Sequence, residues 1–181
     1  MRTSLAVLTL LSGLVVSGCR SGDDEIRITS VRLEDTGSKL LAHVGVHNGT
    51  AYSLYVYERP RRILWDEPTK TLTLAMRENE CTDTSTLCLH YAFPQYREVD
   101  GDTDEDVVVE LPRTLSKLAT PAQGSGSAAP TFEKLEIATA SRVVVEMAWA
   151  DDPVQSTEPG QDPRKAVIAA EREILNGEWR R

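Results

Sequence analysis

The chain has 181 residues, of which 40% are hydrophobic and 27% are charged, and its 20 basic and 28 acidic residues give a formal net charge of −8 at pH 7. That length is enough for one domain with a sizeable hydrophobic core. The acidic balance argues against nucleic-acid binding, because that function needs clustered Lys and Arg to neutralise phosphates, whereas it favours solubility beside anionic lipid.

The N-terminal residues have the three-part pattern of an export signal. A cationic end at Arg2 is followed by an uncharged apolar stretch from Leu5 to Val16, and small residues then precede Cys19. An apolar stretch this short does not span a bilayer as a helix. Residues 1–18 are therefore predicted to be a cleaved signal peptide rather than a transmembrane segment.

The sequence Val16-Ser17-Gly18-Cys19 resembles the lipobox of bacterial lipoproteins. The resemblance implies that Cys19 receives a diacylglycerol, becomes the new N-terminus, and holds the protein on a membrane through two or three acyl chains such as palmitate. Each buried methylene contributes about 0.8 kcal/mol, so such an anchor is effectively permanent. In the family's enterobacterial sorting rule, Arg20 after the cysteine favours the outer membrane of a Gram-negative host. An ordinary secretory signal, with Cys19 near the cut by accident, is the alternative.

Removal of the signal peptide leaves residues 19–24 as a short polar tether before the folded body. The cleaved part contains one of the 20 basic residues and none of the 28 acidic ones, so the mature chain carries a net charge of about −9. We expect residues 25–150 to form the folded domain.

Period-two alternation of apolar residues dominates that domain and predicts half-buried strands. The apolar phase shifts between Ile28 and Val31, which predicts a bulge near Thr29 and Ser30. The alternating segments are Leu40–Val46, Leu54–Val56, Leu72–Met76, Leu87–Phe93, Val107–Leu111 and Val143–Trp149.

Seven or more short strands separated by turn residues predict an all-β fold built as a two-sheet sandwich. Asn48-Gly49 predicts a turn after one of these strands. This turn followed by an aromatic-rich strand is similar to segments of immunoglobulin-like envelope domains, and the similarity implies an immunoglobulin-like sandwich.

Two segments interrupt the strands. Residues 119–130 are rich in Gly, Ser, Ala and Pro and are predicted to be a flexible loop, and residues 151–164 are predicted to be a linker. Asp162-Pro163 predicts a helix start, and Ala166–Leu175 are mostly good helix formers that end at Asn176-Gly177. Residues 165–181 are thus predicted to form a C-terminal helix, with a last strand in which Val167–Ala170 pair into the sandwich as the alternative.

Cys81 and Cys88 remain as an even pair once Cys19 is lipidated. In an exported protein such a pair predicts a disulfide, and closing this short loop contributes about 2.5 kcal/mol in the chain-entropy model. A metal site is the weaker alternative, because two thiols without His or further Cys nearby make a poor zinc site.

The sequence carries no nucleophile motif and no phosphate-binding glycine loop, so we expect a protein that is not an enzyme. His43 and His47 have a four-residue spacing, but on a strand that spacing separates them by about 13 Å, too far to share a metal. We expect both histidines to face solvent, and His90 to be exposed or hydrogen-bonded.

Asp100, Asp102 and Asp104 match the first three ligand positions of an EF-hand loop, and carboxylate oxygens suit calcium. The rest of that pattern fails, because Glu105 stands at the glycine position and Leu111 at the bidentate glutamate position. An acidic hairpin tip that repels edge-to-edge association is the alternative interpretation.

Tyr55, Tyr57 and Arg61 belong to an aromatic and Arg-rich stretch of the kind that interfaces enrich. One hypothesis makes these three residues a docking patch for an envelope partner. The other places Tyr52 and Trp65 in the core, with Arg side chains covering its edge.

Together these features favour a non-catalytic, lipid-anchored protein of the bacterial cell envelope with a binding or scaffolding role. It would contact the membrane through its N-terminal lipid, bind a protein partner of the envelope, and need no cofactor. A calcium-stabilised adhesion module and an envelope enzyme or inhibitor, whose site converges only in three dimensions, are the alternatives.

Overall fold

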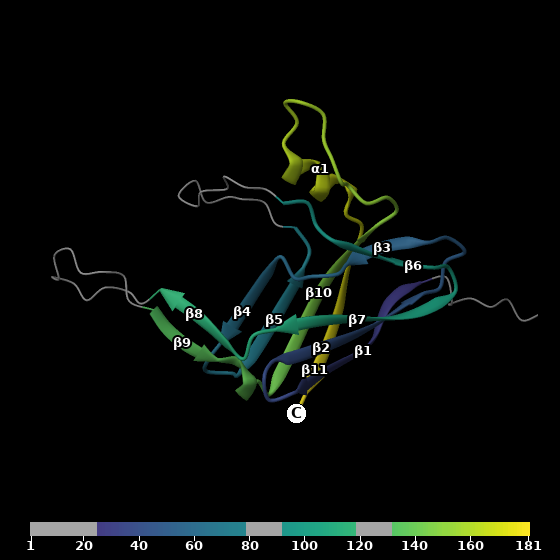
Figure 1. The fold of residues 1–181 in the computed structure, drawn as a ribbon. Coiled ribbons are helices and arrows are strands. Elements are labelled where there is room, and N and C mark those ends of the chain that lie inside the picture. The colour runs from purple at the N-terminus through teal and green to yellow at the C-terminus, as the bar shows by residue number, and fades with distance from the viewer. Residues whose placement is uncertain (1–24, 79–91, 119–131) are drawn as a thin grey trace, which may run out of the picture.

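The computed structural model describes residues 25–78, 92–118 and 132–181 and is mostly β, as the alternation predicts. One short α-helix lies near the C-terminus (Figure 1). The elements in chain order are β1 (Ile26–Asp35), β2 (Leu40–Asn48), β3 (Leu54–Tyr57), β4 (Arg62–Asp66), β5 (Thr71–Met76), β6 (Tyr96–Val99), β7 (Thr103–Leu111), β8 (Thr114–Leu118), β9 (Phe132–Glu136), a 3₁₀ turn (Ile137–Thr139), β10 (Arg142–Ala150), α1 (Pro163–Ala170) and β11 (Ile174–Arg180).

A three-stranded antiparallel sheet has the order β1-β2-β7. The alternation in β2 is confirmed, because Leu40, Ala42, Val44 and Val46 are all fully buried. The bulge predicted in β1 is confirmed too, since the β1–β2 register shifts between Ile28 and Ser30.

The larger sheet has six strands in the order β4-β5-β10-β3-β6, with β11 also paired to β10. β5 and β10 run parallel, whereas the other pairs of this sheet are antiparallel. Parallel neighbours need a long connection, and β5 and β10 are indeed far apart in sequence. The predicted alternation in β10 is confirmed by Val143, Val145 and Met147, which are fully buried.

Buried side chains from both sheets form one hydrophobic cluster, with Leu40 and Val44 from β2 and Leu72 and Val143 from the larger sheet. β11 of the larger sheet also approaches β1 closely. A Cβ atom on Gly177 would lie 2.6 Å from Cγ2 of Ile28 in β1, so this contact requires a residue without a side chain.

The helix begins where Asp162-Pro163 predicts, since the Asp162 side chain accepts a hydrogen bond from the Arg164 backbone N–H at 3.0 Å and Pro163 is the first helical residue. It ends at Ala170, so the helix predicted through Leu175 is too long. Beyond it, residues 174–180 form β11, which pairs with β10 from Ala148 back to Arg142. Pairing with an available strand edge outweighs the helix propensity of this segment. The alternative strand at 167–170 is wrong, because those residues belong to α1.

Besides β11, which lies beyond the alternative strand at 167–170, four strands were not predicted from the sequence: β4, β6, β8 and β9. β8 and β9 form a two-stranded hairpin of their own, which Figure 1 shows beside β4. The loop predicted at 119–130 and most of the strand predicted at 87–93 lie outside the described residues; Phe93, which is described, is not in a strand. Within the part of the chain that the structure describes, no helix is long and apolar enough to cross a membrane.

Candidate functional site

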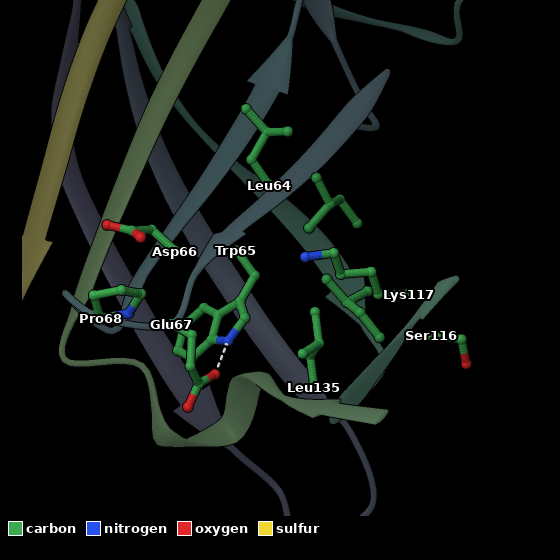
Figure 2. A pocket seen from close by; sticks show the side chains of 10 residues that line it. Leu64, Trp65, Asp66, Glu67, Pro68, Ser116, Lys117 and Leu135 are labelled. Atoms are coloured by element: carbon green, nitrogen blue, oxygen red, sulfur yellow. Dashed lines mark hydrogen bonds between the residues drawn. The ribbon is translucent and has the colours of Figure 1, made fainter. Parts of the chain in front are cut away.

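A groove of about 450 Å³ lies between β4 and the β8–β9 hairpin (Figure 2). Strand β4 forms one wall and the hairpin forms the other. The groove is lined by Ile63, Leu64, Trp65, Asp66, Glu67, Pro68, Leu115, Ser116, Lys117 and Leu135. Six of these ten residues are aliphatic or aromatic, as in sites that bind apolar groups.

Trp65 is held in place within this groove by polar contacts of its ring. Its indole Nε1–H donates a hydrogen bond to Glu67, and the ammonium of Lys70 lies 5.7 Å from the ring centroid, within cation–π range. Hydrogen bonds from Lys70 and then from Trp65 hold the pKa of Glu67 below its usual value. The indole is thus presented to the groove in a fixed orientation.

Lys117 of β8 extends its side chain across the groove toward β4 (Figure 2). Its register partner on β9 is Glu133, but no ion pair of Lys117 is present among the described residues. The groove therefore combines apolar walls with one cation that forms no ion pair within the described residues.

A second feature is a buried polar cluster around Tyr57. Its side chain is fully buried. This is unexpected, because Tyr57 follows the buried Val56 and its side chain should point to the opposite, exposed face of β3. Its phenol donates a hydrogen bond to Oε1 of Glu171, which also accepts the Glu78 backbone N–H at 2.6 Å. Burial is the main cause that raises the pKa of both Tyr57 and Glu171.

The three residues of the predicted docking patch, Tyr55, Tyr57 and Arg61, therefore do not form one exposed surface. Tyr57 lies inside the protein, and Arg61 Nε donates to Oε2 of Glu78 at 3.0 Å, so both residues take part in the buried polar cluster. Tyr55 is half-buried. The other hypothesis is wrong about Tyr52, which is 79% exposed, while Trp65 packs partly against the core and lines the groove.

The acidic segment forms the turn between β6 and β7 and the start of β7. Asp100 accepts a hydrogen bond from Ser53 Oγ at 2.9 Å, and Asp102 is exposed with a positive φ of 57°. Oδ1 of Asp104 lies 3.1 Å from Nδ1 of His47. These carboxylates do not converge. In residues 25–78, 92–118 and 132–181, no group of three or more His, Cys, Asp or Glu side chains is placed to hold a metal ion.

The two histidines of β2 are more covered than the sequence suggests, with side chains only 16% and 15% exposed. His43 Nδ1 lies 2.9 Å from Asp106 of β7, and its Nε2 lies 3.5 Å from Glu34 of β1. His47 lies beside Asp104. Each histidine is thus matched to carboxylates of neighbouring strands, an arrangement that becomes visible only once the register is known.

Asn48 has a structural role beyond the turn that Asn48-Gly49 predicts. Its side chain is fully buried, and Nδ2 donates to the carbonyls of Tyr52, Val99 and Asp100 at 2.7, 3.0 and 3.1 Å. Its Oδ1 accepts the Thr50 backbone N–H at 3.0 Å. Asn48 therefore joins the β2–β3 loop to the β6–β7 turn.

Cys19, Cys81, Cys88 and His90 lie outside the described residues. The disulfide between Cys81 and Cys88 stays a prediction. Mass spectrometry of unreduced peptides from exported protein tests it, and finding both thiols free would contradict it.

Comparison with known proteins does not extend these observations. No family model, no curated protein and no solved structure matches this chain.

Proposed function

We propose that this chain is a lipid-anchored protein of the bacterial cell envelope whose β-rich body binds a partner at the groove beside β4, without catalysing a reaction. The groove carries the proposal: it combines apolar walls from Trp65, Leu115 and Leu135 with the cation of Lys117, which forms no ion pair in the described part of the chain. Apolar surface with few polar groups that fix orientation is typical of binding sites.

The anchor and the fold family are part of the same proposal. The resemblance of residues 16–19 to a lipobox supports attachment through Cys19. Buried side chains from both sheets form a single hydrophobic cluster. This cluster supports an immunoglobulin-like sandwich as the architecture of the body. Such a body on a lipid tether would present the groove to other proteins of the envelope.

Metabolic labelling with an alkyne palmitate tests the anchor. We expect label on the wild-type chain and none on Cys19→Ser, with both variants exported. Absence of label on the wild type, or an unprocessed precursor in the cytosol, contradicts the anchor.

Photo-crosslinking in intact cells tests the binding role. A benzophenone amino acid replaces Leu64, which is 42% exposed at the groove, and a second variant carries it at Tyr52, away from the groove. We expect an adduct of defined mass from the Leu64 position that disappears when Trp65→Ala is added. The same adducts from both positions would contradict a role for the groove.

A further inference from the structure

The groove touches consecutive residues of two different strands. On β4 it contacts residues 63–66, and on β8 it contacts residues 115–117. Successive side chains of a strand point to opposite faces of the sheet. A cavity lined by consecutive residues therefore cannot lie over one face and must run along the edge of the strand. The groove is therefore a slot between two strand edges.

Both of these edges lack a strand partner in the part of the chain that the structure describes. β4 ends the larger sheet and pairs only with β5, and β8 pairs only with β9. An unpaired edge presents a row of backbone N–H and C=O groups that can pair with another strand. The chemistry of the slot therefore suits a peptide in extended conformation, which satisfies such groups by strand addition.

The side chains of β8 indicate which side chains of a bound peptide would fit the slot. Leu115 and Lys117 are two residues apart and so lie on the same face of β8. Glu67 pairs with Lys70, and Asp66 accepts a hydrogen bond from Thr69. Glu133 lies opposite Lys117 on β9, but the structure shows no ion pair between the two. On the edge of β8 that faces away from β9, a carboxylate of the added strand opposite Lys117 could form the ion pair that Lys117 lacks, and an aliphatic side chain opposite Leu115 would complete the apolar wall.

We propose that the slot between β4 and β8 binds an extended peptide segment of a partner protein, which adds as a strand. On one face this segment carries an aliphatic residue and, two positions away, an acidic residue that meets Lys117. The inference rests on the proposed binding function and deepens it by naming the class of partner.

A defined peptide tests the proposal on the full chain in lipid nanodiscs. The probe is acetylated and amidated Val-Thr-Val-Thr-Asp-Thr-Val, which places valine and aspartate two positions apart on one face. One control replaces its aspartate by lysine, and a second carries N-methyl groups on alternate amides, which removes the donors needed for strand addition. Calorimetry measures affinity, and hydrogen exchange locates the amides that become protected.

We expect the probe to bind and to protect amides of β4 and β8, and both control peptides to bind at least fivefold more weakly. Lys117→Ala should weaken binding up to about fivefold, the range of an exposed ion pair, and Lys117→Glu more. Trp65→Ala should weaken it about tenfold or more, since interface anchors of this type dominate affinity. Tyr52→Ala is the matched aromatic control and should leave affinity unchanged. Unchanged exchange protection of β10 checks that each variant is folded.

Equal binding of the N-methylated peptide, protection confined to other strands, or no binding at millimolar peptide would overturn the inference. If these results occur while the Leu64 crosslink still depends on Trp65, strand addition is refuted and the proposed binding function stands. If the crosslink no longer depends on Trp65 either, strand addition and the proposed binding function are both refuted. Concentration-dependent dimers that disappear in Trp65→Ala would instead identify a second copy of this chain as the occupant and would overturn the partner peptide.

Discussion

The hydrogen bond from Tyr57 to Glu171 links β3 to the residue that follows α1, and the substitution Tyr57→Phe removes it without changing the packing of the ring. The ring remains next to Tyr96, at a centroid distance of 5.2 Å. Glu171 keeps the Glu78 backbone N–H at 2.6 Å but loses its other donor in a partly buried environment. A hydrogen bond to a charged group contributes about 1.5 to 3 kcal/mol, so we expect a loss of about 2 kcal/mol in the free energy of unfolding at pH 8.

The same substitution should cost less in acid. The Tyr57 hydrogen bond favours the ionised form of Glu171 and lowers its pKa against the larger effect of burial. Its contribution is therefore greatest where Glu171 is charged, and it falls as the pH drops and the carboxyl group is protonated. A hydrogen bond between neutral groups contributes about 1 kcal/mol, so the cost of Tyr57→Phe should approach that value near pH 4.

Urea unfolding of the full chain, followed by tryptophan fluorescence at pH 8 and pH 4, measures both values. Tyr52→Phe is the matched control, because Tyr52 is 79% exposed, and a surface change of this kind stays within about 0.5 kcal/mol. Equal effects of the two substitutions, or a Tyr57→Phe cost that is larger at pH 4 than at pH 8, would refute the reasoning.

Three further predictions concern the C-terminal segment. Gly177→Ala should lower the free energy of unfolding by about 1 to 3 kcal/mol through overpacking against Ile28; no change in the urea midpoint would contradict the close approach of β11 to β1. Hydrogen bonds from Arg142 and then Arg180 lower the pKa of Glu178 to about 2, so stability from this group is present above about pH 4.3 and is lost as the pH falls toward 2. Glu178→Gln should flatten that acid limb, and an unaltered limb in urea titrations would count against the pairing. Burial raises the pKa of Glu171 overall, so its ionisation opposes folding, and the stability of the wild type relative to Glu171→Gln should fall as the pH rises from 4 to 8; a rise over that range would reverse the assignment.

The alternation of apolar residues was sufficient to predict the strands that form the centre of the protein. Val44 and Val145 are buried at the positions that period two assigns to them, because a strand sends successive side chains to opposite faces whatever its neighbours are. The bulge after Ile28 and the helix start at Asp162 were also predictable, because each depends only on a few adjacent residues.

Only the tertiary structure decided which residues meet across the chain. The groove joins Trp65 to Leu115, the polar cluster joins Tyr57 to Glu171, and the pairing of His47 with Asp104 follows from the β2–β7 register. These contacts depend on strand order and register, which arise from the packing of the whole core rather than from local sequence. The end of α1 has the same origin, because residues 174–180 gain backbone pairing with β10 that a helix prediction does not take into account.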